Sequence, residues 1–327
     1  KKRLDQNQKE YVLREQLRYI RKELGEDNTF SDVEQFEAAL EKLKANKEVK
    51  DKIRKEISRF KSVSGSSSES AVERAYLETL LELGCFSRGK IAALLGNDET
   101  AGSLLREYQK KGYIERVRRD LYVVISLETK QPVVSRYQIG CAVFDDAVIA
   151  NHSAFEVFGF ANQVFYEVYV CTGHRFPEFQ YNGVSYHRLA PKSGMDTVYN
   201  SSVRVTSLEQ TVIDSIADFE KITGLEETLR CIMLIPSLDE GKLVRILGKL
   251  GNGYLWQKCG YVLEELNGML HLSPEFFKAC HDHIAGSKRA LLKETVGPVI
   301  WNRKWDLYVP ESIRTLTDKG GDFRDTV

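Results

Sequence analysis

The chain has 327 residues, 42% of them hydrophobic, which is enough for two or three domains with buried cores. Basic and acidic residues balance at 47 each, so no overall positive field draws the chain to nucleic acid, and any such partner has to be recognised locally. No apolar run reaches the ~18 residues of a membrane span and no signal-peptide core opens the chain, so we expect a cytoplasmic protein without a membrane partner.

The first block, residues 1–70, is predicted to be a helical arm that resembles a coiled coil. Apolar residues recur at intervals of three and four, which places them on one stripe of each helix. These stripes comprise Leu13, Leu17, Ile20 and Leu24, then Val33, Phe36, Leu40 and Leu43, then Val49, Ile53, Ile57 and Phe60. The serine-rich run at 62–68 has nothing to bury and is predicted to be a linker.

The second block, residues 71–128, has the order of a winged helix-turn-helix. A helix is predicted over 71–83, a second is capped by Ser87 and ends at Leu95, and a third is capped by Asn97 or Asp98 and runs to Lys111. The pattern then changes to period two on either side of residues 118–120, which predicts a β-hairpin with its tip there. We interpret this block as a DNA-binding domain.

A winged helix lays its third helix in the major groove of double-stranded DNA, while the wing reaches phosphates or the minor groove. The residues expected on the outward face of the third helix are Glu99, Thr100, Ser103 and Arg106, of which Arg106 is suited to guanine. Arg88 and Lys90 on the preceding helix, and Arg116, Arg118 and Arg119 on the wing, are suited to phosphates. Residues 85–125 hold eight basic and five acidic side chains, a local positive excess.

The third block, residues 129–327, is predicted to be a mixed α/β domain with its strands early and its helices late, which makes the whole chain a multidomain α+β protein. Residues 163–172 are β-rich, and Asn182-Gly183 is a strong hairpin signal. A strand at 203–205 leads into a helix begun at Thr206 or Ser207, and further helices are expected near 224–235, 239–250 and 254–266.

No catalytic, metal or cofactor site is predicted. The six cysteines lack a paired motif and are expected to be reduced and mostly buried, and His281 and His283 beside Cys280 are interpreted as surface histidines. Glu209 is expected to close a capping box with Thr206, and Asp214 to have a structural role. A metal-dependent nuclease built on Asp145, Asp146 and Glu167 is kept as an alternative.

Two resemblances cover different parts of the chain. Residues 1–83 resemble the helical region before the ATPase module of Lon proteases, through the motifs at 8–26 and 66–69 and through Tyr76-Leu77. The chain has no phosphate-binding loop, so the resemblance to Lon proteases assigns neither ATP hydrolysis nor proteolysis to it. An interaction module built on this arm is therefore a second alternative.

From about residue 76 to 327 the chain resembles AbiEi-type antitoxins, through the winged domain and the motifs at 149–155, 205–214 and 258–264. This resemblance implies a repressor of its own operon, bound to inverted repeats in its promoter. It also implies the antitoxin of a type IV toxin-antitoxin (abortive phage infection) system, which counters a nucleotidyltransferase toxin without necessarily touching it. A homodimer on DNA or through the arm is expected. The two resemblances join inside the predicted helix at 71–83, in a natural or an engineered fusion.

Overall fold

A computed structural model of the protein describes residues 27–42, 47, 50–51, 53–55, 57–58, 84–126, 129–284, 286, 288–293, 298–311 and 313. The chain divides into two compact units, Lys1–Ser135 and Arg136–Val327. The predicted helices before residue 27 and over 71–83, the serine-rich linker and the junction of the two resemblances lie outside the described residues.

The first unit contains α2 (Asp27–Lys42), a helix pair and a small sheet. α2 buries Val33, Phe36 and Leu40, the stripe that the spacing predicted, while Glu34 and Glu37 on the other side are exposed. Further along the first block, Ile53 and Ile57 are also buried, as predicted.

The helix pair α5 (Arg88–Leu95) and α6 (Asp98–Lys111) has the caps that the sequence indicated. The Ser87 hydroxyl accepts a hydrogen bond from the Lys90 amide, and Asn97 Oδ1 accepts from the amides of the first turn of α6. Gly96 ends α5 with φ 66°, a left-handed conformation that turns the chain between the two helices. α6 packs inward through Ala101, Leu105 and Tyr108.

Three antiparallel strands complete this unit, in the order β1-β3-β2. β2 (Ile114–Arg118) and β3 (Leu121–Val124) form the predicted hairpin. β1 (Cys85–Ser87), an unpredicted strand, pairs with β3.

The second unit begins with α7 (Arg136–Cys141) and a six-stranded mixed sheet, ordered β6-β7-β5-β4-β9-β8. α8 (His152–Phe158) follows β4 in the chain. The strands are β4 (Val148–Ile149), β5 (Glu167–Cys171), β6 (Phe179–Tyr181), β7 (Val184–Leu189), β8 (Thr197–Asn200) and β9 (Val203–Thr206). Asn182 and Gly183 both have positive φ and connect β6 to β7, as the hairpin signal predicted.

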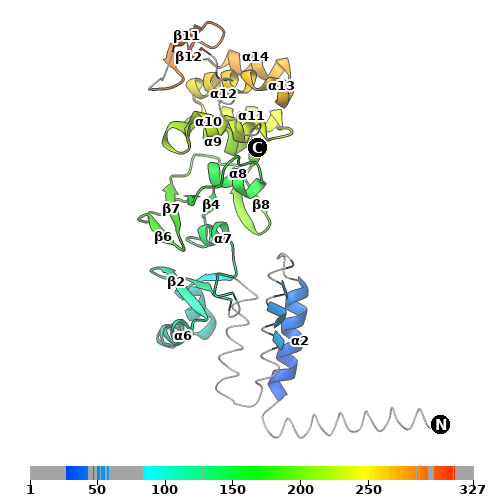
Figure 1. Ribbon diagram of the computed structural model, residues 1–327, viewed down its shortest axis with the longest axis vertical. Coiled ribbons are helices and arrows are strands. Elements are labelled where there is room, and N and C mark those ends of the chain that lie inside the picture. Colours follow the sequence, from blue (N-terminus) through cyan, green and yellow to red (C-terminus); the bar gives the residue numbers. More distant parts are fainter. Residues whose placement is uncertain are drawn as a thin grey trace, which may run out of the picture. The chain divides into compact units, whose positions relative to one another are not determined.

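Helices follow the sheet and gather beside it, with α9 (Leu208–Asp218) packed against α8, α10, α11 and α12 (Figure 1). The elements after α9 are η1 (Phe219–Lys221), α10 (Gly224–Met233), α11 (Glu240–Leu250), α12 (Gly253–Glu265), α13 (Asn267–Leu270) and α14 (Pro274–Asp282). The ranges of α10, α11 and α12 match the predicted helices.

A second small sheet follows these helices, ordered β10-β12-β11. Its strands are β10 (Arg289–Ala290), β11 (Val299–Asn302) and β12 (Leu307–Pro310). The prediction that strands come early and helices late is therefore wrong for the end of the unit, where strands return after the helices. The fully buried Trp305, in the turn between β11 and β12, packs on α12 at Gly260, where an added Cβ would lie 2.1 Å from its ring.

The predicted capping box at the start of α9 is wrong. The cap is Ser207, whose hydroxyl accepts from the Gln210 amide, because the Thr206 hydroxyl is instead paired with Thr211 at 2.7 Å. Glu209 accepts a hydrogen bond from the Asp239 amide at 3.0 Å and so fixes the loop before α11.

All six cysteines are free thiols, and all except the half-buried Cys141 are buried, as predicted. No helix among the described residues combines the length and the apolar character needed to cross a membrane.

Candidate nucleic-acid interface

The outward face of α6 presents the residues expected to read bases. Glu99, Thr100, Ser103 and Arg106 are exposed on the helix that buries Ala101 and Leu105. Arg106 donates hydrogen bonds to the Gly102 carbonyl at 3.1 Å and to the Ser103 hydroxyl at 3.2 Å, both uncharged acceptors. Its positive charge is held on the surface, and no carboxylate in the described part of the chain pairs with it.

Lys110, which was not among the predicted contact residues, extends this face. It lies four residues after Arg106, so both side chains occupy neighbouring positions on one helix face, and it is exposed. The interval of four residues between Arg106 and Lys110 could have identified it from the sequence. Lys110 and Lys111 also lie in the last turn of α6, where positive charge stabilises the helix dipole.

Arg88, expected to contact phosphate, is engaged within the protein. Its guanidinium makes a two-pronged ion pair with Asp98, with Nη2 and Oδ2 2.6 Å apart, and Nη2 also donates to the Asp98 carbonyl. The guanidinium lies against α6 at Gly102. Arg88 thus ties α5 to the start of α6, and we assign it a positioning role. Lys90 is exposed.

The hairpin tip separates its three arginines. A bulge between Arg116 and Arg118 leaves Val117 as an extra residue that points into the core. Arg119 is exposed in the turn, and so is Arg116, which donates to the Arg118 carbonyl at 3.2 Å. Arg118 is half-buried, and burial lowers its pKa against the opposing effect of Asp120. Arg116 and Arg119 are therefore the solvent-facing arginines of the hairpin.

The three carboxylates of the nuclease alternative are not brought together. Glu167 begins β5, whereas Asp146 accepts hydrogen bonds from Thr172 and Gly173, just beyond the other end of that strand. Five residues of extended strand span about 17 Å, too far for one metal ion to bridge. Asp145 is exposed, and it belongs to no group of potential metal ligands among the described residues.

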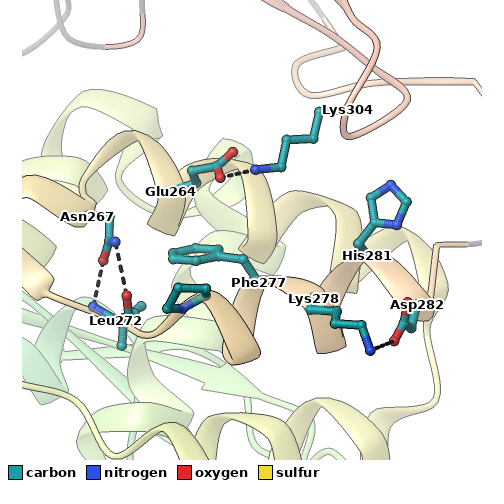
Figure 2. A pocket seen from close by; sticks show the side chains of 9 residues that line it. Glu264, Asn267, Leu272, Phe277, Lys278, His281, Asp282 and Lys304 are labelled. Carbon is teal, nitrogen blue, oxygen red and sulfur yellow. Dashed lines mark hydrogen bonds and ion pairs between the residues drawn. The ribbon is translucent and has the colours of Figure 1, made fainter.

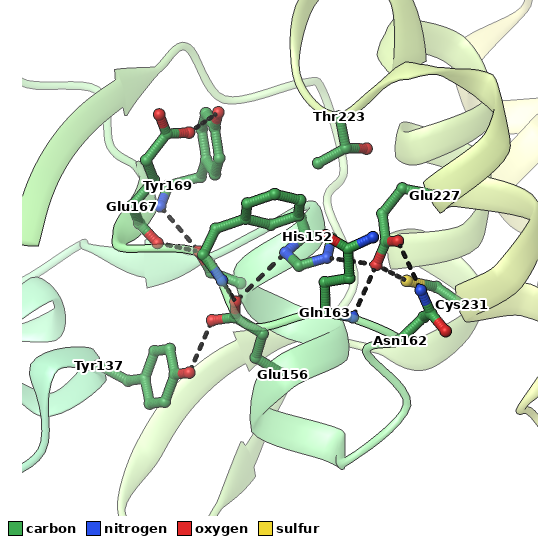
Figure 3. Close-up of polar contacts among 12 residues, drawn as sticks. Tyr137, His152, Glu156, Asn162, Gln163, Glu167, Tyr169, Thr223, Glu227 and Cys231 are labelled. Atoms are coloured by element: carbon green, nitrogen blue, oxygen red, sulfur yellow. Dashed lines mark hydrogen bonds and ion pairs between the residues drawn. The ribbon is translucent and has the colours of Figure 1, made fainter. Parts of the chain in front are cut away.

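One buried group in the second unit has potential metal ligands. His152, Glu227 and Cys231 place their ligand atoms within 4.8 Å of one another (Figure 3). Glu227 already accepts hydrogen bonds from His152 Nε2 at 3.1 Å, from the Asn162 side chain at 3.0 Å and from the Gln163 amide at 3.0 Å. The carboxylate is thus satisfied by protein donors.

The other side of this histidine faces a second carboxylate. His152 Nδ1 lies 3.4 Å from Glu156, which also pairs with Arg136 at 2.8 Å and accepts from the Tyr137 hydroxyl. Burial alone lowers the pKa of His152, but its hydrogen bonds to Cys231, Glu156 and Glu227 together raise it to about 10. The positive charge of the protonated imidazole balances the two buried carboxylates, so the close approach of these side chains requires no metal ion.

A pocket of about 550 Å³ lies among the late helices, and several of the polar groups that line it are hydrogen-bonded or ion-paired to one another (Figure 2). Asn267 makes two hydrogen bonds to the backbone of Leu272, and Glu264 pairs with Lys304 and with the indole of Trp305. His281, exposed as expected, lies at its edge, while His283 is exposed and stacks on Trp256.

The comparisons with known proteins match one regulator family and a set of Lon proteases. Residues 74–125 match the family described as "Transcriptional regulator, AbiEi antitoxin". The Lon protease of Lachnoclostridium phytofermentans is 55% identical over 83 residues, 25% of this chain and 10% of that protein. The Lon protease of Clostridioides difficile is 45% identical over 84 residues, 25% of this chain and 11% of that protein. The chain thus matches about a tenth of the length of these relatives.

A similar fold occurs among solved structures. The crystal structure of the RV2827C protein from Mycobacterium tuberculosis superposes with a TM-score of 0.53 and 14% identity, over 72% of this chain and 89% of that one. At this identity the likeness concerns the fold alone.

Proposed function

We propose that the chain is a DNA-binding transcriptional repressor and the antitoxin of a type IV toxin-antitoxin system, that it has no enzymatic activity, and that residues 71–128 act as a winged helix-turn-helix. The observation that carries the proposal is the exposed row Ser103, Arg106 and Lys110 on α6, within the segment that matches the regulator family. The helix pair and the adjacent hairpin have the order that a winged domain needs.

In this proposal α6 enters the major groove of inverted repeats in the chain's own promoter, as a homodimer. Arg106 contacts a guanine, and the exposed Arg116 and Arg119 of the hairpin contact phosphates. Repression of the operon then limits a nucleotidyltransferase toxin without a required contact between the two proteins.

A gel shift with the chain's upstream promoter DNA tests the DNA-binding step. We expect salt-sensitive, sequence-specific binding that Arg106→Ala weakens by about 1–3 kcal/mol, with relaxed specificity at one base pair. Arg119→Ala should weaken binding to all sequences alike and reduce the salt dependence by about one phosphate contact.

Two matched controls sharpen this test. Lys278→Ala removes an exposed charge from α14 in the second unit and should leave binding unchanged. Arg88→Ala should weaken DNA binding less than Arg119→Ala does, because the Arg88 guanidinium is already ion-paired with Asp98. Absence of binding to any inverted repeat at moderate salt would refute the regulator.

The Lon match favours a second candidate, a protein-protein interaction module in which residues 1–70 form an arm that mediates self-association. Sedimentation of the full chain and of a chain beginning at residue 71 distinguishes the two. A change of oligomeric state combined with no DNA binding supports the interaction module.

A further inference from the structure

The small sheet near the end of the second unit has an open edge. β11 is the outer strand in the order β10-β12-β11, and β12 is its single neighbour among the described strands. β11 and β12 lie at one end of the second unit (Figure 1). The residues assigned to DNA contact all belong to the first unit, so the proposed DNA binding does not use this edge.

The hydrogen-bonding pattern of the sheet shows which backbone groups of β11 face the open side. The Glu311 amide donates to the Pro298 carbonyl at 3.2 Å, just before β11 begins. Along an antiparallel pair, hydrogen-bonded and non-hydrogen-bonded positions alternate. Val299 and Trp301 therefore occupy non-hydrogen-bonded positions opposite β12. Their amides and carbonyls point away from β12.

Two features of β12 agree with this assignment. The carbonyl of Tyr308, which is opposite Trp301, accepts a hydrogen bond from the Leu291 amide at 2.8 Å, on the side of the sheet away from β11. Pro310 has no amide hydrogen and is opposite Val299, where none is needed. The outward amides and carbonyls of β11 are thus available to a further strand.

The side chains of this edge are apolar on both faces of the sheet. Val299 and Ile300 point to opposite faces and are 41% and 46% exposed. Tyr308, 43% exposed, extends the face of Val299 and lies 4.8 Å from Trp301 between ring centroids. β11 contains no charged residue or proline, and its register with β12 is regular. It lacks the features by which proteins usually protect an edge strand.

The strand is complementary to a second copy of itself. In an antiparallel pair of two β11 strands, one register places Val299 of each copy opposite Trp301 of the other. Each of these pairs exchanges two backbone hydrogen bonds, and the two Ile300 side chains meet on the twofold axis between them. Pro298 is then opposite Asn302, at a position that needs no amide hydrogen. A β-branched residue opposite an aromatic one is a favourable cross-strand pair.

The charges next to β11 do not oppose this pairing. Arg303 follows the strand, three residues from the axis, so its two copies would be about 20 Å apart. The Lys288 ammonium lies 5.0 Å from the centroid of the Trp301 ring. Both basic residues are exposed, so the pairing does not require a charge to be buried.

We propose that two copies of the chain associate through β11, antiparallel about a twofold axis at Ile300, so that their small sheets become one continuous sheet. The role of this contact rests on the proposed function, in which a homodimer binds inverted repeats. A contact of this size is small, and we expect association that depends on concentration in the micromolar range.

Sedimentation velocity of the DNA-free full chain tests the proposal. We expect the wild type to shift from monomer to dimer as its concentration rises through the micromolar range. Ile300→Lys and Ile300→Glu should each abolish the dimer, because like charges then face each other on the axis. Tyr199→Lys is the matched control. It places the same charge on β8, the uncharged edge strand of the larger sheet, where Tyr199 is 77% exposed, and it should leave the dimer unchanged.

A mixture of the two charged variants separates a lost contact from a damaged fold. Equal amounts of Ile300→Lys and Ile300→Glu should restore the dimer, since a lysine then faces a glutamate. A monomeric wild type, a dimer that survives Ile300→Lys, a dimer lost in Tyr199→Lys, or a mixture that stays monomeric would overturn the proposal. Failure of the proposed function is detected separately, by a gel shift on DNA with a single repeat, which depends on Arg106 and not on Ile300.

Discussion

Replacing His152 by alanine should destabilise the second unit more than any surface change. The imidazole is 3% exposed and lies between Glu156 and Glu227, both also buried. Its removal leaves two buried carboxylates with the half-buried Arg136 as the remaining charged partner of Glu156. Loss of one member of a buried ion pair costs about 3–5 kcal/mol, so we expect the variant to lose that much unfolding free energy.

The effect has a defined dependence on pH. The pKa of His152 is about 10 in the folded protein against an ordinary value of 6.5, so protonation favours the folded state. The stabilisation is fully present below about pH 6.5 and is lost as the pH rises through about 10. The difference between wild type and His152→Ala should therefore shrink between pH 6.5 and pH 10.

Guanidinium denaturation followed by tryptophan fluorescence measures this directly, because all three tryptophans, Trp256, Trp301 and Trp305, belong to the second unit. Lys278→Ala, an exposed change on α14, is the control. A loss below 1 kcal/mol, or a loss equal at both pH values, would show that the imidazole is not held as a cation.

Three further predictions follow from the same geometry. Gly260→Ala should cost about 3 kcal/mol in the fluorescence assay, because the added Cβ meets the buried Trp305 ring, whereas an unchanged midpoint would mean that the indole can move aside. Asn97→Ala should cost about 1 kcal/mol and speed hydrogen exchange in the first turn of α6, and unchanged exchange would show that the cap contributes little. EDTA should leave the melting temperature of the wild type unchanged, since protein donors satisfy Glu227; a fall that Zn²⁺ reverses would place a metal beside His152.

Local signals in the sequence were enough for much of the fold. The caps at Ser87 and Asn97, the hairpins at 119–120 and 182–183, and the ranges of α10, α11 and α12 all depend on residues that are neighbours in the chain. The buried stripe of α2 likewise depends on spacing alone. Such features are visible in a sequence because hydrogen-bonding geometry and helical periodicity are short-range properties.

Pairings between distant residues were decided by the tertiary structure. β1 is only three residues long and forms because β3 offers it an edge, and the sheet β10-β12-β11 depends on Trp305 packing on a glycine of α12. The same holds for the proposed interface. The sequence supplied Arg88 and Arg118 as solvent-facing cations, but the first is paired with Asp98 and the second is half-buried.

By itself the sequence determined several of the helices and two hairpins, where the basic residues of α6 lie, and which two families the chain resembles. The structure alone decided which of those basic residues reach solvent and that His152 lies between two carboxylates. The reason is physical: exposure and the pairing of buried charge depend on which distant segments pack together, and no spacing along the chain records that.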